Sequence, residues 1–310
     1  MSWWQVWQIV STPDNTPVVA LLFLMPFFVW LGLRQARAND RLIGQLEADP
    51  EMRRTHHRKT QPLEPGWAKE VHVWPFLLRM EFLAAIIVTI ILMVWALSLN
   101  APLEALANPH VTPNPEKAPW YFMALQEMLY YFDPWFAGVV VPTLIIIGLM
   151  AIPFIDTNPL GRGYYTWKQR KFAISAFLFG LFLWMLLMCF GVFIRGPGYM
   201  WFWPGQFWDP ARVVFTVNRN LPDLFHITSA WGKGIFGAAV LGIYYAVVGY
   251  GFFRLMTWNE FNRKIFRRMS LLQIFVMDFL LTTMMLVPVK VIIMHAFRIK
   301  YIWMTPWFNI

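Results

Sequence analysis

Six long, nearly uncharged apolar stretches dominate the amino-acid sequence. A helix needs about 20 residues at 1.5 Å each to cross the core of a bilayer, and stretches near this length lie at 17–34, 82–99, 134–155, 173–194, 235–256 and 271–294. Charged residues make up only 14% of the chain, against roughly 25% in soluble domains. The sequence predicts an all-α integral membrane protein with about six transmembrane helices, and excludes a disordered chain and a typical cytosolic enzyme.

Lysine and arginine gather on one side of these predicted spans. The connecting segments 34–79, 156–172 and 254–270 hold most of the 26 lysine and arginine residues. Such residues are enriched in cytoplasmic loops, so both termini and the segments 100–133 and 195–234 are expected on the outer, periplasmic side of a bacterial cytoplasmic (inner) membrane. The net charge of +9 is then explained by loop topology and by contact with the lipid bilayer, and predicts no nucleic-acid partner.

Two outer segments are rich in aromatic residues. Segment 195–210 and the C-terminal segment 301–310 combine Trp, Phe and Tyr with Gly and Pro. Aromatic rings favour the membrane interface, which indicates interfacial belts, and large exposed apolar patches can also dock partner subunits. Both interpretations stay open on the sequence alone.

The segment between the second and third spans carries the most specific pattern. Pro119 is suited to the start of a helix because its missing N–H costs nothing there. A helix from Pro119 to about Tyr131 places Trp120 and Glu127 on one face. An amphipathic helix with aromatic walls and a carboxylate is what a quinol oxidation site needs, because the head group needs apolar walls and its hydroxyl proton needs an acceptor. The competing interpretation is an aromatic anchor with a solvated Glu127.

Motifs in this region resemble the C-terminal half of cytochrome b. The family signature Pro-Glu-Trp-Tyr marks its quinol-oxidation loop, and bacterial members carry Lys-Ala-Pro-Trp-Tyr-Phe followed by Leu-Gln-Glu. Matching runs lie at 117–122, 125–127, 131–135 and 153–159. The resemblance is to subunit IV of cytochrome b6f-like complexes and to a bacterial long form of a split Rieske/cytochrome b complex.

The resemblance divides the chain into three segments. Residues 1–69 would form the first transmembrane helix and a basic cytoplasmic segment. Residues 70–195 would form the subunit IV-like domain. Residues 196–310 would add the outer aromatic segment and two further transmembrane helices.

One position departs from the family signature. Aligning the Trp-Tyr pair puts Pro119 where the family has its Glu. Glu127 is the first candidate for the proton acceptor because it shares a helix face with Trp120, Glu116 is the second, and Asp133 is the third. The quinone-binding residues that the resemblance implies are Pro119, Trp120, Tyr121 and Phe122.

Histidine and cysteine bear on where the redox cofactors lie. Members of the family hold two b haems with paired histidines on helices of the N-terminal half. The six histidines here are His56, His57, His72, His110, His226 and His295, and no predicted span carries a pair. The single Cys189 allows no internal disulfide and no Cys-based metal site. The b haems and an iron–sulfur cluster are therefore expected on partner subunits.

The resemblance implies a membrane subunit of a quinol-oxidising Rieske/cytochrome b (bc-type) electron-transfer complex. The chain would form part of the outer-side quinol oxidation site for ubiquinone or menaquinone, couple oxidation to proton release, and have no activity alone within a quinol:cytochrome c (or other acceptor) oxidoreductase. Its partners would be a haem-bearing cytochrome b N-terminal-half subunit, a Rieske iron–sulfur protein and, as a further candidate, a c-type cytochrome. The alternative is a membrane anchor of a periplasmic oxidoreductase without its own working quinone site.

Overall fold

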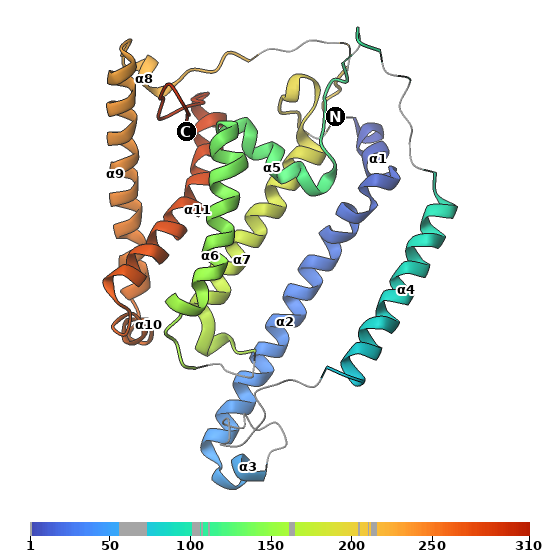
Figure 1. Ribbon diagram of the computed structural model, residues 1–310, viewed down its shortest axis with the longest axis vertical. Helices are drawn as coiled ribbons and strands as arrows, with labels where there is room; N and C mark the ends of the chain where they lie inside the picture. The colour runs from blue at the N-terminus through green and yellow to red at the C-terminus, as the bar shows by residue number, and fades with distance from the viewer. Residues whose placement is uncertain are drawn as a thin grey trace. The chain divides into compact units, whose positions relative to one another are not determined.

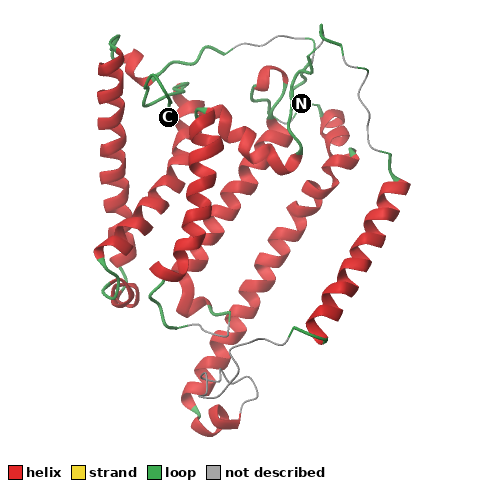
Figure 2. Ribbon diagram, in the orientation of Figure 1, coloured by secondary structure: helices red, strands yellow, loops and turns green. Residues whose placement is uncertain are grey.

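The computed structural model is built from helices (Figures 1 and 2). It describes residues 2–55, 73–100, 106, 108–110, 112–160, 165–203, 205–209, 211 and 216–310, and this part of the chain contains no β-strand. His56, His57, His72 and the end of the basic segment after Thr55 lie outside the described residues. The all-α fold class predicted from the sequence is confirmed.

Six helical segments within the described residues are long and apolar enough to cross a membrane. They comprise α2 (Thr16–Ala48), α4 (Phe76–Ser98), α6 (Val141–Ile155), α7 (Trp167–Cys189), α9 (Ala230–Thr257) and α11 (Leu271–Phe297). Each overlaps one of the apolar stretches in the sequence, which confirms the predicted spans. Helix α2 continues past the predicted end of its span because residues 35–48 are mostly good helix formers such as Ala, Leu, Arg, Gln and Glu.

Short helices and turns connect the long ones. They are α1 (Trp3–Ser11), η1 (Pro13–Asn15), α3 (Pro50–Thr55), α5 (Trp120–Tyr131), η2 (Phe136–Val140), η3 (Phe190–Ile194), η4 (Pro197–Tyr199), α8 (Leu221–Leu224) and α10 (Glu260–Phe266). Two of them, η2 and η3, are π-helical turns that adjoin α6 and α7. Such turns are rare and often occur at functional sites.

The chain forms two compact units. The first comprises Met1–Ile9, His110–Leu160 and Lys168–Ile310, and the second comprises Val10–Pro109 and Gly161–Trp167. In the second unit every residue of α4 is exposed. Since α4 is almost entirely apolar, this surface suits lipid or partner helices. The three-segment division drawn from the sequence stays a prediction.

One buried region of the first unit lies where α5 packs on η3, the π-helical turn that follows α7. Met123 and Met128 of α5 are buried, together with Leu187 of α7. Gly191 in η3 makes the close approach possible, because a Cβ atom there would stand 2.3 Å from Cγ of Met123. The contact fixes α5 against η3.

Helix α11 closes the same unit. It begins with a capping box in which the Ser270 side chain accepts from the Gln273 N–H and the Gln273 side chain reaches back. It ends at Arg298, which adopts the left-handed conformation with φ 57°. Helices α9 and α6 pack along it, and its C-terminal end lies near α5 (Figure 1).

Candidate functional site

Helix α5 begins where the sequence predicted, directly after Pro119, and ends at Tyr131. The loop before it is fastened to the helix by Gln126. The Ala118 N–H donates to Oε1 of Gln126 at 2.8 Å, and Nε2 of Gln126 donates to the Glu116 carbonyl at 3.1 Å. These two bonds give the start of α5 a defined position.

The aromatic residues implied as quinone-binding lie together at this start. Tyr121 and Phe122 expose 56% and 54% of their surface, and Trp120 is half-buried. Each ring contacts the ring of the next residue. The ring centroids are 5.6 Å apart for Trp120 and Tyr121 and 4.9 Å apart for Tyr121 and Phe122. The rings form an apolar surface that faces outward from this chain, as a site completed by another subunit would require.

Behind this surface lies a buried ion pair. Glu127 of α5 and Arg195, the residue after η3, both have 0% exposed surface. Nη2 of Arg195 lies 2.5 Å from Oε1 of Glu127, and its Nε donates to Oε1 at 3.1 Å and Oε2 at 3.0 Å. The forked contact matches the planar guanidinium to the carboxylate, and it satisfies two charges that would be costly to bury alone.

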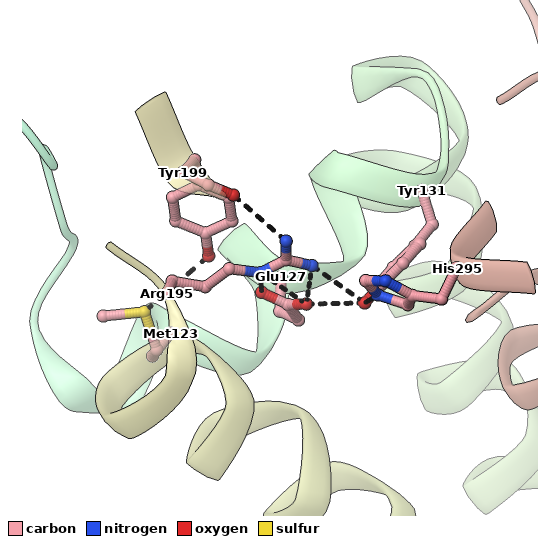
Figure 3. Close-up of polar contacts among 6 residues, drawn as sticks. All are labelled: Met123, Glu127, Tyr131, Arg195, Tyr199 and His295. Atoms are coloured by element: carbon pink, nitrogen blue, oxygen red, sulfur yellow. Dashed lines mark hydrogen bonds and ion pairs between the residues drawn. The ribbon is translucent and has the colours of Figure 1, made fainter. Parts of the chain in front are cut away.

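Two further side chains join this pair (Figure 3). The Tyr131 hydroxyl, one helical turn after Glu127, donates to Oε1 of Glu127 at 2.7 Å and accepts from Nη2 of Arg195 at 2.9 Å. Nε2 of His295 in α11 lies 3.0 Å from the same hydroxyl. The cluster therefore connects α5, the residue after η3 and the end of α11.

Aromatic rings enclose the guanidinium. The carbon at its centre lies 4.0 Å from the ring centroid of Tyr130, 5.0 Å from Tyr199 and 5.5 Å from Trp201. Its Nη1 also donates to the Tyr199 carbonyl at 3.0 Å. Burial acts to lower the pKa of Arg195, but hydrogen bonding to Glu127 and its negative charge outweigh burial and raise the pKa. The arginine is a permanent cation in this cluster.

Residues 106–202, which contain α5, η3 and Arg195, match the family model described as cytochrome b (C-terminal)/b6/petD. This segment is similar to the C-terminal part of cytochrome b. The match confirms the resemblance seen in the sequence motifs, and with the six apolar helices it indicates a multi-pass membrane subunit of a bc-type electron-transport complex. No solved structure matches the chain.

Lys117 was not singled out by the sequence, although it lies in the cytochrome b segment. Its Nζ donates to the Val192 carbonyl at 2.9 Å. Burial lowers the pKa of Lys117 to about 8; the negative charge of Glu127 opposes this shift, and the positive charge of Arg195 adds to it. The signal available in the sequence was a lysine directly before the aromatic run.

The three candidate proton acceptors lie in different surroundings. Glu127 is buried in the ion pair, and Glu116 is exposed on the loop before α5. Oδ1 of Asp133 accepts from the Trp135 N–H at 3.0 Å, and its Oδ2 accepts from Nδ2 of Asn309 at 3.3 Å. Asp133 thus shapes the turn after α5 and ties it to the C-terminal residues.

The histidines of the described residues do not fit a haem-ligand pair. His110 and His226 lie in loops and His295 lies in α11, so no two of these three share a helix. Within the described part of the chain, no group of three or more His, Cys, Asp or Glu side chains is placed to hold a metal ion.

A cavity of about 610 Å³ lies away from the aromatic surface. Apolar residues of α6, α7 and α11 line most of it, and it runs from Met128 toward Asp156 and Arg170, which form an ion pair. Neither Trp120, Tyr121 nor Phe122 lines it. The quinone-binding surface implied by the family therefore differs from this cavity.

Proposed function

We propose that the chain forms part of the outer-side quinol oxidation site of a bc-type complex. The observation that carries the proposal is the arrangement of α5, which exposes Tyr121 and Phe122 and holds Glu127 in a buried pair with Arg195. Both features belong to the matched cytochrome b segment. Oxidation there would release protons on the outer side.

The aromatic residues would bind the quinone ring. Trp120, Tyr121 and Phe122 supply rings that can stack on a flat apolar head group, and Pro119 holds them at the first turn of the helix. Because Tyr121 and Phe122 point away from this chain, a haem-bearing cytochrome b subunit would supply the opposite wall. This arrangement explains why the chain alone would have no activity.

Glu127 would accept the quinol proton. Its Oε2 receives one hydrogen bond, from Nε of Arg195, whereas Oε1 receives three. A carboxylate oxygen offers about two lone-pair sites, so Oε2 retains one for an incoming proton. Protonation of Glu127 would weaken the ion pair and change the charge balance around Arg195. Glu116 is the second candidate, because it is exposed beside the aromatic residues.

The partners follow from the two electrons of the quinol. A Rieske iron–sulfur cluster and the b haems of a cytochrome b N-terminal-half subunit would take them, and a c-type cytochrome is a further candidate partner. The complex would lie in a bacterial cytoplasmic membrane, with ubiquinone or menaquinone as its substrate.

The test is a purification of the tagged chain in mild detergent, followed by a dithionite-reduced minus oxidised spectrum. We expect a b-type haem band, together with a multi-histidine partner and an iron–sulfur protein in the same particle. A stable particle without b haem would contradict the proposal.

One observation favours a second function. Pro119 stands where the family signature has its glutamate, and Glu127 is buried rather than exposed. A membrane anchor for a periplasmic oxidoreductase would need the aromatic surface only for docking. A haem-free particle that contains a periplasmic oxidoreductase would support this alternative.

A further inference from the structure

His295 is the exposed end of the buried cluster. Glu127 and Tyr131 have 0% exposed surface, whereas His295 is exposed at the C-terminal end of α11. Helix α11 lies outside the matched segment 106–202. The fold thus brings a histidine from outside the matched segment into contact with it.

The Tyr131 hydroxyl has one proton and three hydrogen-bonding neighbours. It lies 2.7 Å from Oε1 of Glu127, 2.9 Å from Nη2 of Arg195 and 3.0 Å from Nε2 of His295. Arginine can only donate, so the hydroxyl proton points either to Glu127 or to His295. When it points to Glu127, Nε2 of His295 carries a proton and donates to the hydroxyl. When it points to His295, Nε2 accepts.

Both arrangements use the same positions of the heavy atoms. The imidazole ring of His295 is held by Trp201, with ring centroids 4.5 Å apart, and by Tyr131, at 5.8 Å. The end of α11 is also fixed, because the Arg298 N–H donates to the Met294 carbonyl at 2.9 Å. The contact between the tyrosine and the histidine therefore depends on packing and not on a mobile side chain.

We infer that Glu127, Tyr131 and His295 form a proton relay that ends at Nδ1 of His295. The inference rests on the proposed function, because a quinol hydroxyl supplies the proton at Glu127. The quinol proton binds first at Oε2 of Glu127, and rotation of the carboxyl group brings it to the oxygen position that faces Tyr131. Protonated Glu127 then passes this proton to the Tyr131 oxygen as the tyrosine proton moves to Nε2 of His295. The imidazole then releases a proton from Nδ1 to the outer aqueous phase. One proton enters and one leaves, and rotation of the hydroxyl with tautomer exchange restores the starting state.

Charged groups around His295 affect release of its proton. Glu127 and Tyr131 face it from α5, and Arg195 faces it from the residue after η3. On α11 itself, Lys290 lies one and a half turns earlier and donates to the Lys300 carbonyl, and Arg298 follows at the helix end. The positive charge of Arg195 repels a proton on the imidazole, and the Glu127 carboxylate opposes this repulsion.

The test compares variants in the purified complex. His295→Gln removes the titrating ring, and Tyr131→Phe removes the central hydroxyl. His226→Asn is the matched control, because His226 is exposed in a loop with φ 55°, a conformation that Asn tolerates. Quinol oxidation is measured from pH 5.5 to 9, together with proton release reported by a pH-sensitive dye.

We expect both relay variants to oxidise quinol at least about tenfold more slowly, since a general acid–base group contributes about 10²–10⁴-fold. The KM for quinol should stay unchanged, and the pH profile should lose one ionisation. A third variant, His295→Ala, leaves space for a free imidazole molecule in place of the side chain. Added imidazole should therefore restore quinol oxidation in His295→Ala but not in Tyr131→Phe. His226→Asn should match the wild-type protein.

Two outcomes overturn the relay. One is wild-type turnover and pH profile in His295→Gln. The other is a slow His295→Ala complex that binds quinol normally and does not respond to imidazole, which would show a packing role.

A second measurement needs no turnover, and it separates failure of the relay from failure of the proposed function. In pH-difference infrared spectra of the purified protein, protonation of His295 should shift the carboxylate bands of Glu127, and Tyr131→Phe should abolish this shift. Unshifted bands contradict the relay even if the complex oxidises quinol. Shifted bands in a protein without quinol oxidation would instead contradict the proposed function alone.

Discussion

At the residue scale, a fully buried carboxylate–guanidinium pair lies directly behind exposed aromatic rings. Glu127 and Arg195 are 68 positions apart in the sequence, and Tyr131 and His295 are 164 apart. A helix-face argument finds Glu127, because Trp120 lies on the same short helix. It cannot find Arg195 or His295, since their contacts depend on how separate helices pack. The sequence therefore supplied candidate residues on α5, and the contacts of Arg195 and His295 with them came only from the structure.

Loss of the Glu127 charge should destabilise the protein. Glu127→Ala leaves Arg195 buried without a partner, which costs about 3–5 kcal/mol. The matched control is Asp223→Asn, which breaks the exposed pair of Asp223 with Lys233 at 2.6 Å and should cost within about 1 kcal/mol. Denaturant unfolding of the detergent-solubilised protein measures both. Equal losses would show that the buried pair contributes no more than the exposed one.

Lys117 should make stability depend on pH. Its pKa falls from 10.5 to about 8 on folding, chiefly through burial, so between these values the unfolded chain binds more protons than the folded one. The free energy of unfolding should therefore rise as pH increases from about 8 toward 10.5. Relative to Lys117→Met, the wild-type protein should gain stability over this range.

Lys264→Met is the control for this titration, because Lys264 is exposed in α10. Its stability should follow the wild-type pH dependence. The same pH dependence in Lys117→Met and in the wild-type protein would rule out a depressed pKa at this lysine.

At the element scale, the π-helical turn η3 sets the position of α5. Gly191 allows Met123 to pack against the turn, and Arg195 begins the segment that follows it. The sequence predicted the span and the helix on either side of this contact. It did not predict the π-helical turn, because the pattern of apolar residues is the same for an α-helix and a π-helical turn within a continuous apolar run.

Gly191→Ala should displace α5. The added Cβ would lie 2.3 Å from Cγ of Met123 and 3.4 Å from its carbonyl oxygen, and overpacking of this kind costs about 1–3 kcal/mol. Quinol oxidation should fall with stability, and a second change, Met123→Ala, should recover part of both. Gly251→Ala is the control, because nothing lies within 4 Å of the added atom. An unaffected Gly191→Ala complex would show that η3 does not position the site.

At the scale of the whole molecule, composition and hydropathy were sufficient to predict the fold class, an all-α membrane protein. The six predicted spans correspond to six apolar helices in the described residues. The sequence motifs also identified the cytochrome b segment that the family match places at residues 106–202. What they left open was how α9 and α11 relate to that segment. The structure answers this through α11, whose His295 contacts the Tyr131 hydroxyl of α5.

We propose that quinol binds at the start of α5. The most direct measurement is photolabelling of the purified complex with a photoactivatable quinone, followed by peptide mapping with and without an excess of unlabelled quinol. We expect label on the peptide that contains Trp120, Tyr121 and Phe122, and loss of that label in the presence of competitor. Competitor-sensitive label confined to α6, α7 and α11 around the cavity, with none at the start of α5, would contradict it.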